Sequence, residues 1–234
     1  MASVLISGTD TDVGKTWVSV SLAAYWQQYR YHYSPKNNDL KNQLAIFKLI
    51  QTGIGDYELY DRLFAEEAAI KVATPLCFTT PIAPPLAAAK ENKIIDLGKI
   101  WQALQTLTAQ NFVLIEAIGG LGSPVTSELT VADLAAEWRL PTVLVVPVKL
   151  GAIAHAVANV ALARSLNVDL KGIILSCTNS ESASRLEDLT PVDLIESLTQ
   201  TPILGILPYI SELTDLNKLA KVSSSWDLEV ILPN

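Results

Sequence analysis

The sequence is poor in the residues that build disulfide frameworks and metal cages, with only two cysteines and two histidines among 234 residues. Cys77 and Cys177 are too far apart in the chain to indicate a disulfide framework, and they lack metal-ligand spacing. We expect both thiols to be buried in a protein of the reducing cytoplasm. The chain also shows no Ser/His/Asp set and no Cys/His pairing, so nothing supports nucleophilic hydrolysis.

Charged residues are scarce at 18%, and basic ones scarcer still: 17 Lys and Arg against 24 Asp and Glu give a net charge of −7. Nucleic-acid binders and proteins of anionic membrane surfaces need a positive face, so this balance disfavours both partner classes. A phosphate-binding site remains compatible with an acidic protein, because a few backbone amides and one lysine can bind phosphate.

Long uninterrupted hydrophobic runs are absent as well. The N-terminal residues have no basic start and a very short apolar run, unlike a secretory signal. Residues 140–163 have the length of a membrane span, but prolines, Lys149 and Gly151 interrupt them, and their composition changes from β-branched to alanine-rich. A buried strand followed by a helix fits this pattern better. We expect a cytoplasmic protein that does not bind membranes.

What the chain does have is a 50% share of hydrophobic residues, arranged in short runs. Seven runs predict buried strands, and most are continuous, as expected for a parallel sheet covered on both faces. The predicted strands are residues 4–7, 45–50, 112–116, 142–148, 172–177, 203–207 and 229–232. The predicted helices are residues 15–29, 56–65, 97–110, 130–138, 152–166 and 191–198. This alternation predicts one doubly wound α/β domain over residues 1–234, with about seven mostly parallel strands.

The polar segment 29–44 contains helix breakers and predicts a surface loop. No internal repeat and no linker divides the chain. In doubly wound sheets ligands bind beyond the carboxyl ends of the strands, so the functional residues are expected there.

The strongest motif follows the first predicted strand and reads GTDTDVGKT over residues 8–16. A strand, a glycine-containing loop, Gly-Lys-Thr and a helix form the layout of a phosphate-binding P-loop, here with one extra loop residue. Gly14 lets the backbone approach phosphate, and the helix N-terminus adds free amides. Lys15 would neutralise β- and γ-phosphate charge, and the Thr16 hydroxyl could ligate Mg²⁺.

Three further strand ends carry candidate residues. Glu116 ends a strand before Gly119, where a P-loop enzyme places an acid that organises Mg²⁺. Lys48 lies in an otherwise apolar strand, where its ammonium needs either a partner or a route to solvent. Gly151 opens a small-residue helix whose bare amides suit a carboxylate or phosphate. His155, one turn into that helix, is either a ligand contact or a packed or capping histidine.

Taken together, these residues resemble the dethiobiotin synthetase family. The similarity covers nearly the whole chain: the P-loop with its extra residue, then residues 48–53, 116–120, 148–151 with His155, and 204–208. The resemblance implies an ATP-dependent cyclo-ligase that forms the cyclic urea of dethiobiotin from 7,8-diaminopelargonic acid and CO2. In that family a substrate amine is carbamylated, ATP phosphorylates the carbamate, and the second amine closes the ring. Mg²⁺ is the implied cofactor, ATP the co-substrate and a homodimer the implied assembly.

The resemblance also implies roles for individual residues. Lys15 would hold the β- and γ-phosphates, and Lys48 would stabilise the carbamate and the migrating phosphoryl group, so these two are the expected catalytic residues. The expected Mg²⁺ ligands are Thr16, Asp56 and Glu116. The expected nucleotide-binding residues are Asp12, Val13, Gly14, Lys15, Thr16, Trp17, Asp56, Glu116, Ala117, Ile118, Gly119, Ser176, Pro208, Tyr209, Ile210 and Glu212. The expected substrate-binding residues are Thr11, Thr52, Gly151 and Ala152, the last two from the neighbouring subunit.

Three features depart from the family pattern. The connection after Thr52 is unusually short, which leaves Asp61 as an alternative to Asp56 for the metal. Ala117 and Ile118 replace a Gly-Ala pair, which predicts a restricted backbone and added bulk beside the phosphates. Ser176 stands where the family has a base-reading asparagine. Because a hydroxyl cannot give an amide's paired donor and acceptor, we expect weak discrimination among nucleoside triphosphates.

Two other functions remain open at this point. The first is a nucleotide-switched interaction ATPase of the partition type, which shares this fold. Such proteins usually carry a lysine early in the P-loop, where this chain has Asp10. The second is a degenerate, inactive relative, which Ala117 and Ile118 would favour.

Overall fold

The structure is a computed structural model that describes residues 3–31, 43–64, 70–109, 112–212 and 214–233. Most of the predicted surface loop 29–44 lies outside these residues. The strands of the central sheet are β1 (Ser3–Gly8), β2 (Leu44–Lys48), β4 (Ile70–Ala73), β6 (Phe112–Gly120), β7 (Thr142–Pro147), β8 (Leu170–Ser176) and β9 (Ile203–Leu207). They pair in the order β4-β2-β6-β1-β7-β8-β9, and every pairing is parallel. The predicted fold class is therefore confirmed.

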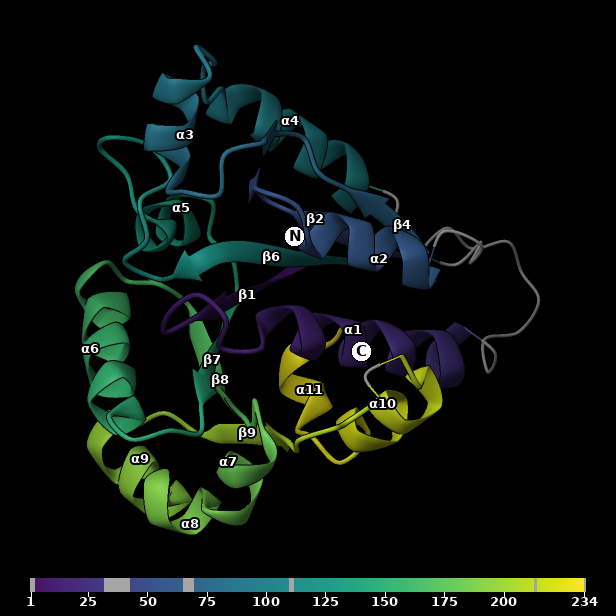
Figure 1. The fold of residues 1–234 in the computed structure, drawn as a ribbon, viewed down its shortest axis with the longest axis vertical. Coiled ribbons are helices and arrows are strands. Elements are labelled where there is room, and N and C mark those ends of the chain that lie inside the picture. Colours follow the sequence, from purple (N-terminus) through teal and green to yellow (C-terminus); the bar gives the residue numbers. More distant parts are fainter. Residues whose placement is uncertain (1–2, 32–42, 65–69, 110–111, 213, 234) are drawn as a thin grey trace.

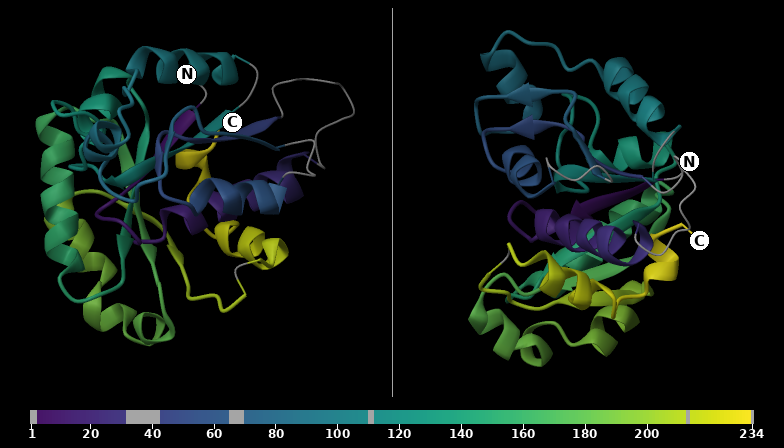
Figure 2. Two further views of the ribbon diagram at one scale, coloured as in Figure 1. Left: turned by 45° about the horizontal axis from the view of Figure 1, so that its top comes forward. Right: turned by 90° about the vertical axis from the view of Figure 1, so that its right-hand side faces the viewer.

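Helices cover both faces of this sheet (Figures 1 and 2). The main helices are α1 (Lys15–Tyr25), α2 (Asp56–Phe64), α4 (Leu97–Thr108), α5 (Val131–Glu137), α6 (Ala152–Ser165), α9 (Val192–Thr199), α10 (Leu216–Ser223) and α11 (Leu228–Ile231). The smaller elements are η1 (Trp26–Tyr31), a π-helix that continues α1, with α3 (Pro84–Lys90), α7 (Ser180–Ser184) and α8 (Leu186–Leu189). Two short strands, β3 (Gln51–Thr52) and β5 (Cys77–Phe78), pair in a separate small sheet.

Alternation along the strands divides the core into two clusters. Leu5, Phe47 and Ile115 face a cluster that includes residues of α4, α5 and α6. Their neighbours Ile46 and Leu114 face the opposite cluster, which includes residues of α1, α2 and α10. Because successive side chains of a strand point to opposite faces, each strand contributes to both clusters. The central sheet therefore lies between two hydrophobic cores.

Two sequence predictions about the outer elements are wrong. Residues 229–232 do not form a strand, because Leu228–Ile231 is the short helix α11. The seventh strand is instead β4, which pairs with β2 through Leu44 and Ile70.

The expectation of two buried thiols holds for Cys177 only, since Cys77 is exposed. In the described part of the chain, no helix has the length and apolarity to cross a membrane.

Candidate active site

The loop between β1 and α1 has the backbone geometry of a phosphate-binding loop. Gly14 caps α1 in the left-handed region, with φ 97°, and no side chain caps the helix there. A Cβ on Gly14 would lie 2.2 Å from the Ser176 hydroxyl oxygen, so this position also has no room for a side chain. Asp12 is left-handed too, with φ 56°, a conformation that Asp tolerates better than most residues. The uncapped end of α1 keeps its backbone amides and its positive dipole available to an anion.

The sheet register brings Lys48 and Glu116 together. Lys48 lies opposite Glu116 in the pairing of β2 with β6. Both follow the alternation of Ile46 and Leu114, so their side chains project toward the face covered by α1 and α2. Lys48 and Glu116 are 4% and 1% exposed, and a charge buried this deeply requires partners.

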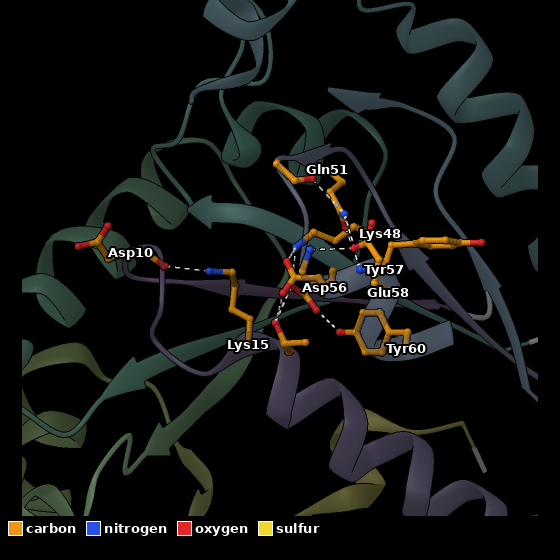
Figure 3. Close-up of polar contacts among 12 residues, drawn as sticks. Asp10, Lys15, Lys48, Gln51, Asp56, Tyr57, Glu58 and Tyr60 are labelled. Carbon is orange, nitrogen blue, oxygen red and sulfur yellow. Dashed lines mark hydrogen bonds and ion pairs between the residues drawn. The ribbon is translucent and has the colours of Figure 1, made fainter. Parts of the chain in front are cut away.

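The partners come from the first turns of α1 and α2. The Lys48 ammonium pairs with Asp56 and lies 2.6 Å from the Oε1 atom of Glu116. The Thr16 hydroxyl lies 2.8 Å from the Oδ1 atom of Asp56 and 3.1 Å from the Oε1 atom of Glu116. Four elements thus converge on one polar cluster, which we call the Lys48 cluster: Thr16, Lys48, Asp56 and Glu116 (Figure 3). Asp61 is exposed, so of the two candidates Asp56 is the one that enters this cluster.

The charges of the cluster reinforce each other. Burial would lower the pKa of Lys48, but the carboxylates of Glu116 and Asp56 outweigh it and raise this pKa above its ordinary value of 10.5. Burial would likewise raise the pKa of Asp56, but the Lys48 ammonium outweighs it and lowers that pKa below 3.8. Lys48 and Asp56 are therefore both ionised at neutral pH.

Tyr60 is a member of this network that the sequence analysis missed. It is fully buried, and its hydroxyl donates a hydrogen bond to the Oε2 atom of Glu116. Burial, followed by the Glu116 charge, raises the pKa of Tyr60 well above 10.0, so the phenol keeps its proton. Its position one helical turn after Asp56 was the available signal, because residues four apart share a helix face.

Lys15 makes a different contact in this structure. Its Nζ atom donates to the backbone oxygen of Asp10, at 2.9 Å, and the side chain extends away from the Lys48 cluster (Figure 3). Lys15 is 6% exposed, and burial lowers its pKa below 10.5, more than the nearby carboxylates of Glu116 and Asp56 raise it. The ammonium has no carboxylate partner among the described hydrogen bonds, which suits it to a phosphate group.

The short connection between Lys48 and Asp56 is held by Gln51, which the sequence analysis also missed. The Gln51 side chain donates to Glu58 at 2.8 Å and accepts from the Tyr57 amide at 2.8 Å. Glu58 in turn accepts from the Gly55 amide at 2.8 Å. These contacts tie the first residue of β3 to the start of α2, which places Asp56 beside Lys48.

Two adjoining cavities meet at the P-loop. The larger, of about 530 Å³, is lined by Asp12, Gly14, Thr16, Trp17, Gly55, Asp56, Leu59, Arg62, Ser176, Cys177, Thr178, Leu207, Pro208, Tyr209 and Ile210. The smaller, of about 230 Å³, is lined by Thr11, Asp12, Gly14, Lys15, Thr16, Lys48, Ile50, Gln51, Thr52, Ile54, Gly55, Asp56, Glu116, Ile118 and Gly119. Five residues line both: Asp12, Gly14, Thr16, Gly55 and Asp56. Most of the residues expected from the sequence therefore line one or both of these cavities.

Some expected residues lie elsewhere. Val13 is buried in the core beneath the loop, and Glu212 is exposed and lines neither cavity. The expectation for Ala117 needs correction. Its side chain points to the face opposite Glu116, into the core with α4 and α5, and lines neither cavity, whereas Ile118, the residue expected to add bulk beside the phosphates, lines the smaller cavity. Ala117 also sits inside β6 without a positive φ, and the left-handed residue is Gly119, with φ 57°.

The predicted carboxylate site on α6 is separate from both cavities of this chain. Gly151 is exposed with φ 86°, and no side chain caps α6 there, while Ala152 is buried. His155 is exposed and lines neither cavity. A role for Gly151 and Ala152 in substrate binding therefore needs a second copy of the chain.

The Lys48 cluster fits a magnesium ion by its donor chemistry. Mg²⁺ prefers oxygen ligands at about 2.1 Å in an octahedron, which places neighbouring ligand oxygens about 3 Å apart. The oxygens of Thr16, Asp56 and Glu116 lie at such separations, 2.8 and 3.1 Å from the Thr16 hydroxyl. Among the described residues, no group of three or more His, Cys, Asp or Glu could hold a metal on its own. This agrees with an ion that one or two carboxylates share with substrate phosphates.

Comparisons with known proteins give one consistent answer. Residues 2–217 match a family described as an AAA domain. The chain is 58% identical over 234 residues, all of both chains, to an ATP-dependent dethiobiotin synthetase BioD of Gloeothece citriformis. A protein of the same name from Crocosphaera subtropica is 55% identical, over 99% of this chain and 100% of its own length. Another, from Synechocystis, is 50% identical over 97% of this chain and 93% of its own.

Solved structures share the fold at low sequence identity. A ParA family ATPase from Chlorobium tepidum superimposes with a TM-score of 0.58 at 11% identity, over 98% of this chain and 95% of that one. The MinC:MinD cell division complex of Aquifex aeolicus gives 0.55 at 14% identity, over 97% and 93%. At such identities the similarity shows the fold alone, and it does not favour a partition-type function.

Proposed function

Because the chain belongs to the dethiobiotin synthetase family, we propose that the Lys48 cluster and the two cavities beside it are its reaction centre. The chain is an ATP-dependent cyclo-ligase of biotin synthesis, and its substrates are small molecules that include ATP. The observation that carries the site assignment is the convergence of Thr16, Lys48, Asp56 and Glu116 between the cavities.

In this proposal the larger cavity binds the nucleotide. Its volume of about 530 Å³ lies within the range of small-molecule sites, and the N-terminus of α1 opens into it beside Gly14. Pro208, Tyr209 and Ile210 supply the surface for the base and ribose. Lys15 exchanges its hydrogen bond to the Asp10 carbonyl for hydrogen bonds to the β- and γ-phosphates, because an ammonium binds a charged phosphate oxygen more strongly than a neutral carbonyl oxygen.

Thr16, Asp56 and Glu116 would hold Mg²⁺ in the same proposal. When bound, the ion neutralises charge on the phosphate oxygens during phosphoryl transfer. The residues of the chain provide the oxygen donors and hold them in place through Lys48.

The smaller cavity takes the diamine. Thr11 and Thr52 offer polar groups to its amines, while Ile50, Ile54 and Ile118 line it with apolar surface suited to an aliphatic chain. The Lys48 ammonium, which lines this smaller cavity, stabilises the negative charge of the carbamate that one amine forms with CO2. The same ammonium then stabilises the charge of the phosphoryl group that moves from ATP to this carbamate. The second amine displaces phosphate and closes the ring.

The substrate carboxylate is assigned to the uncapped N-terminus of α6 in a second subunit. The Gly151 amide and the helix dipole suit a carboxylate, whereas the Ala152 amide would first have to release its hydrogen bond to the Lys149 carbonyl. Leu150 beside them is 88% exposed, as expected for an apolar residue that a homodimer would cover. A cytoplasmic location belongs to the same proposal, since the reaction consumes ATP.

Isotope transfer tests this function. The chain would be incubated with 7,8-diaminopelargonic acid, ATP, Mg²⁺ and bicarbonate labelled with carbon-13. We expect mass spectrometry to show the label in the ureido carbon of dethiobiotin. Unlabelled or absent product would refute the proposed use of CO2.

A further inference from the structure

The two oxygens of the Glu116 carboxylate have different partners. Oε1 accepts from Lys48 at 2.6 Å and from Thr16 at 3.1 Å, on the side of the cavities. Oε2 accepts from the hydroxyl of Tyr60, a residue that lines neither cavity. One oxygen therefore faces the proposed reaction centre, and the other accepts a hydrogen bond from a buried tyrosine of the core.

We propose that Tyr60 is a positioning residue for the metal ligand Glu116, because its hydroxyl fixes Oε2 and thereby aims Oε1 at Thr16 and Lys48. This inference rests on the proposed assignment of Glu116 to the metal. Tyr60 touches no substrate in this account and acts only through Glu116.

Glu116 needs such a partner for two reasons. The terminal torsion of a glutamate is broad and nearly two-fold, so the strand alone does not fix the carboxylate plane. At 1% exposure the side chain has little access to water, and without Tyr60 the Oε2 atom would have no described donor. Partners that hydrogen-bond a metal ligand fix its orientation, so that the ligand is already in place when the ion binds.

The position of Tyr60 suits this role. Tyr60 follows Asp56 by one turn of α2, so the same helix supplies a metal ligand and the residue that orients another. Its ring is packed in the cluster with α1 and α10. A phenylalanine keeps that ring and removes only the hydroxyl, which separates the hydrogen bond from the packing.

The test uses Mn²⁺ as a paramagnetic probe for the metal site. Free and bound Mn²⁺ are measured by electron paramagnetic resonance on the full chain with a non-hydrolysable ATP analogue. Loss of a partner that orients a metal ligand typically weakens metal affinity about 10- to 100-fold. We expect Tyr60→Phe to weaken Mn²⁺ binding by at least about tenfold, while the affinity for the analogue in EDTA stays unchanged.

Tyr57→Phe is the matched control. Tyr57 lies on the same helix, but its ring points away from the Lys48 cluster (Figure 3), so its metal affinity should equal that of the unaltered chain. Thermal unfolding of both variants checks that each is folded at the assay temperature.

Glu116→Gln separates this inference from the assignment on which it rests. If Glu116→Gln binds Mn²⁺ as tightly as the unaltered chain, the metal assignment itself is wrong. If Glu116→Gln weakens binding and Tyr60→Phe does not, only the positioning role is overturned. If Tyr60→Phe weakens metal and metal-free nucleotide binding equally, the hydroxyl supports the fold in general, and the inference also fails.

Discussion

Replacing Lys48 by alanine perturbs both the stability and the chemistry of the protein, and the structure predicts the size of each effect. The ammonium pairs with two carboxylates, and the side chain of Glu116 is 1% exposed while that of Asp56 is 37% exposed. Removing one partner of a buried ion pair costs about 3–5 kcal/mol, because the remaining charge is left uncompensated. Since water screens Asp56 partly, we expect a loss near the lower limit, about 3 kcal/mol of unfolding free energy.

The expected effect on turnover comes from lost charge stabilisation. Removing one preorganised donor from the developing charge of a transition state costs about 10²–10³ in kcat, or about 2.7–4 kcal/mol. Lys48→Ala should therefore retain at most about 1% of the turnover, measured where urea titration shows the variant to be folded.

Lys71→Ala is the matched control for Lys48→Ala. Lys71 lies on β4, in the same sheet, but its side chain is exposed and lines neither cavity. Its unfolding free energy and turnover should match those of the unaltered chain. A folded Lys48→Ala with turnover within about twofold of the unaltered chain would remove Lys48 from the mechanism. An unchanged unfolding free energy would contradict the account of its buried ion pairs.

Three further predictions follow from the same geometry. Gly151→Ala, at φ 86° with no atom within 4 Å of the new Cβ, should lower the unfolding free energy only by the left-handed strain of about 1–2 kcal/mol. Gly14→Ala, whose Cβ would lie 2.2 Å from the Ser176 oxygen, should lower it more in urea titrations. Equal losses of unfolding free energy would contradict the close packing at Gly14. Turnover with ATP, CTP and GTP should differ little if Ser176 leaves the base unread, and a strong preference for ATP would show that another residue reads it. Because Lys48 outweighs burial and lowers the pKa of Asp56 below 3.8, ionised Asp56 stabilises the fold above that pH and the contribution is lost as pH falls through the lowered pKa. The acid-unfolding curve of Asp56→Asn should therefore be flatter below about pH 4, and a curve parallel to that of the unaltered chain would refute this contribution.

Six of the seven central strands could be predicted from the sequence, because strands covered on both faces are short continuous apolar runs. The outer elements could not. A run as short as 229–232, with three apolar residues after Glu229, is compatible with strand or helix. In the fold its two buried apolar residues pack with Trp226 in the cluster on the α1 side of the sheet, and Trp226 lies over Gly205 of β9. The run Ile70–Ala73 became a strand only because β2 offers it a free edge.

The candidate site divides in the same way. The P-loop was predictable because Gly14, Lys15 and Thr16 are adjacent in sequence and their spacing follows from phosphate geometry. Lys48 and Glu116 were predictable as polar residues at the ends of apolar strands, whereas their contact depends on the sheet order. Tyr60 was missed because a tyrosine on an amphipathic helix is ordinarily part of the core, although its spacing from Asp56 places both residues on one helix face.

Gln51 and Ala117 show the same limit at the level of single side chains. The role of Gln51 depends on a turn that brings it to the first turn of α2, and no local pattern indicates that turn. The side of the sheet to which Ala117 points follows from strand alternation, since Glu116 points to the other. That alternation was available in the sequence, but family resemblance pointed to the phosphates instead.

The central claim is that one centre couples ATP cleavage to ring closure of a diamine. The most direct test measures phosphate release and dethiobiotin in the same reaction, with ATP, Mg²⁺ and bicarbonate present and 7,8-diaminopelargonic acid varied. The account predicts that phosphate release rises with the diamine and equals the dethiobiotin formed. Phosphate release that is independent of the diamine would contradict it.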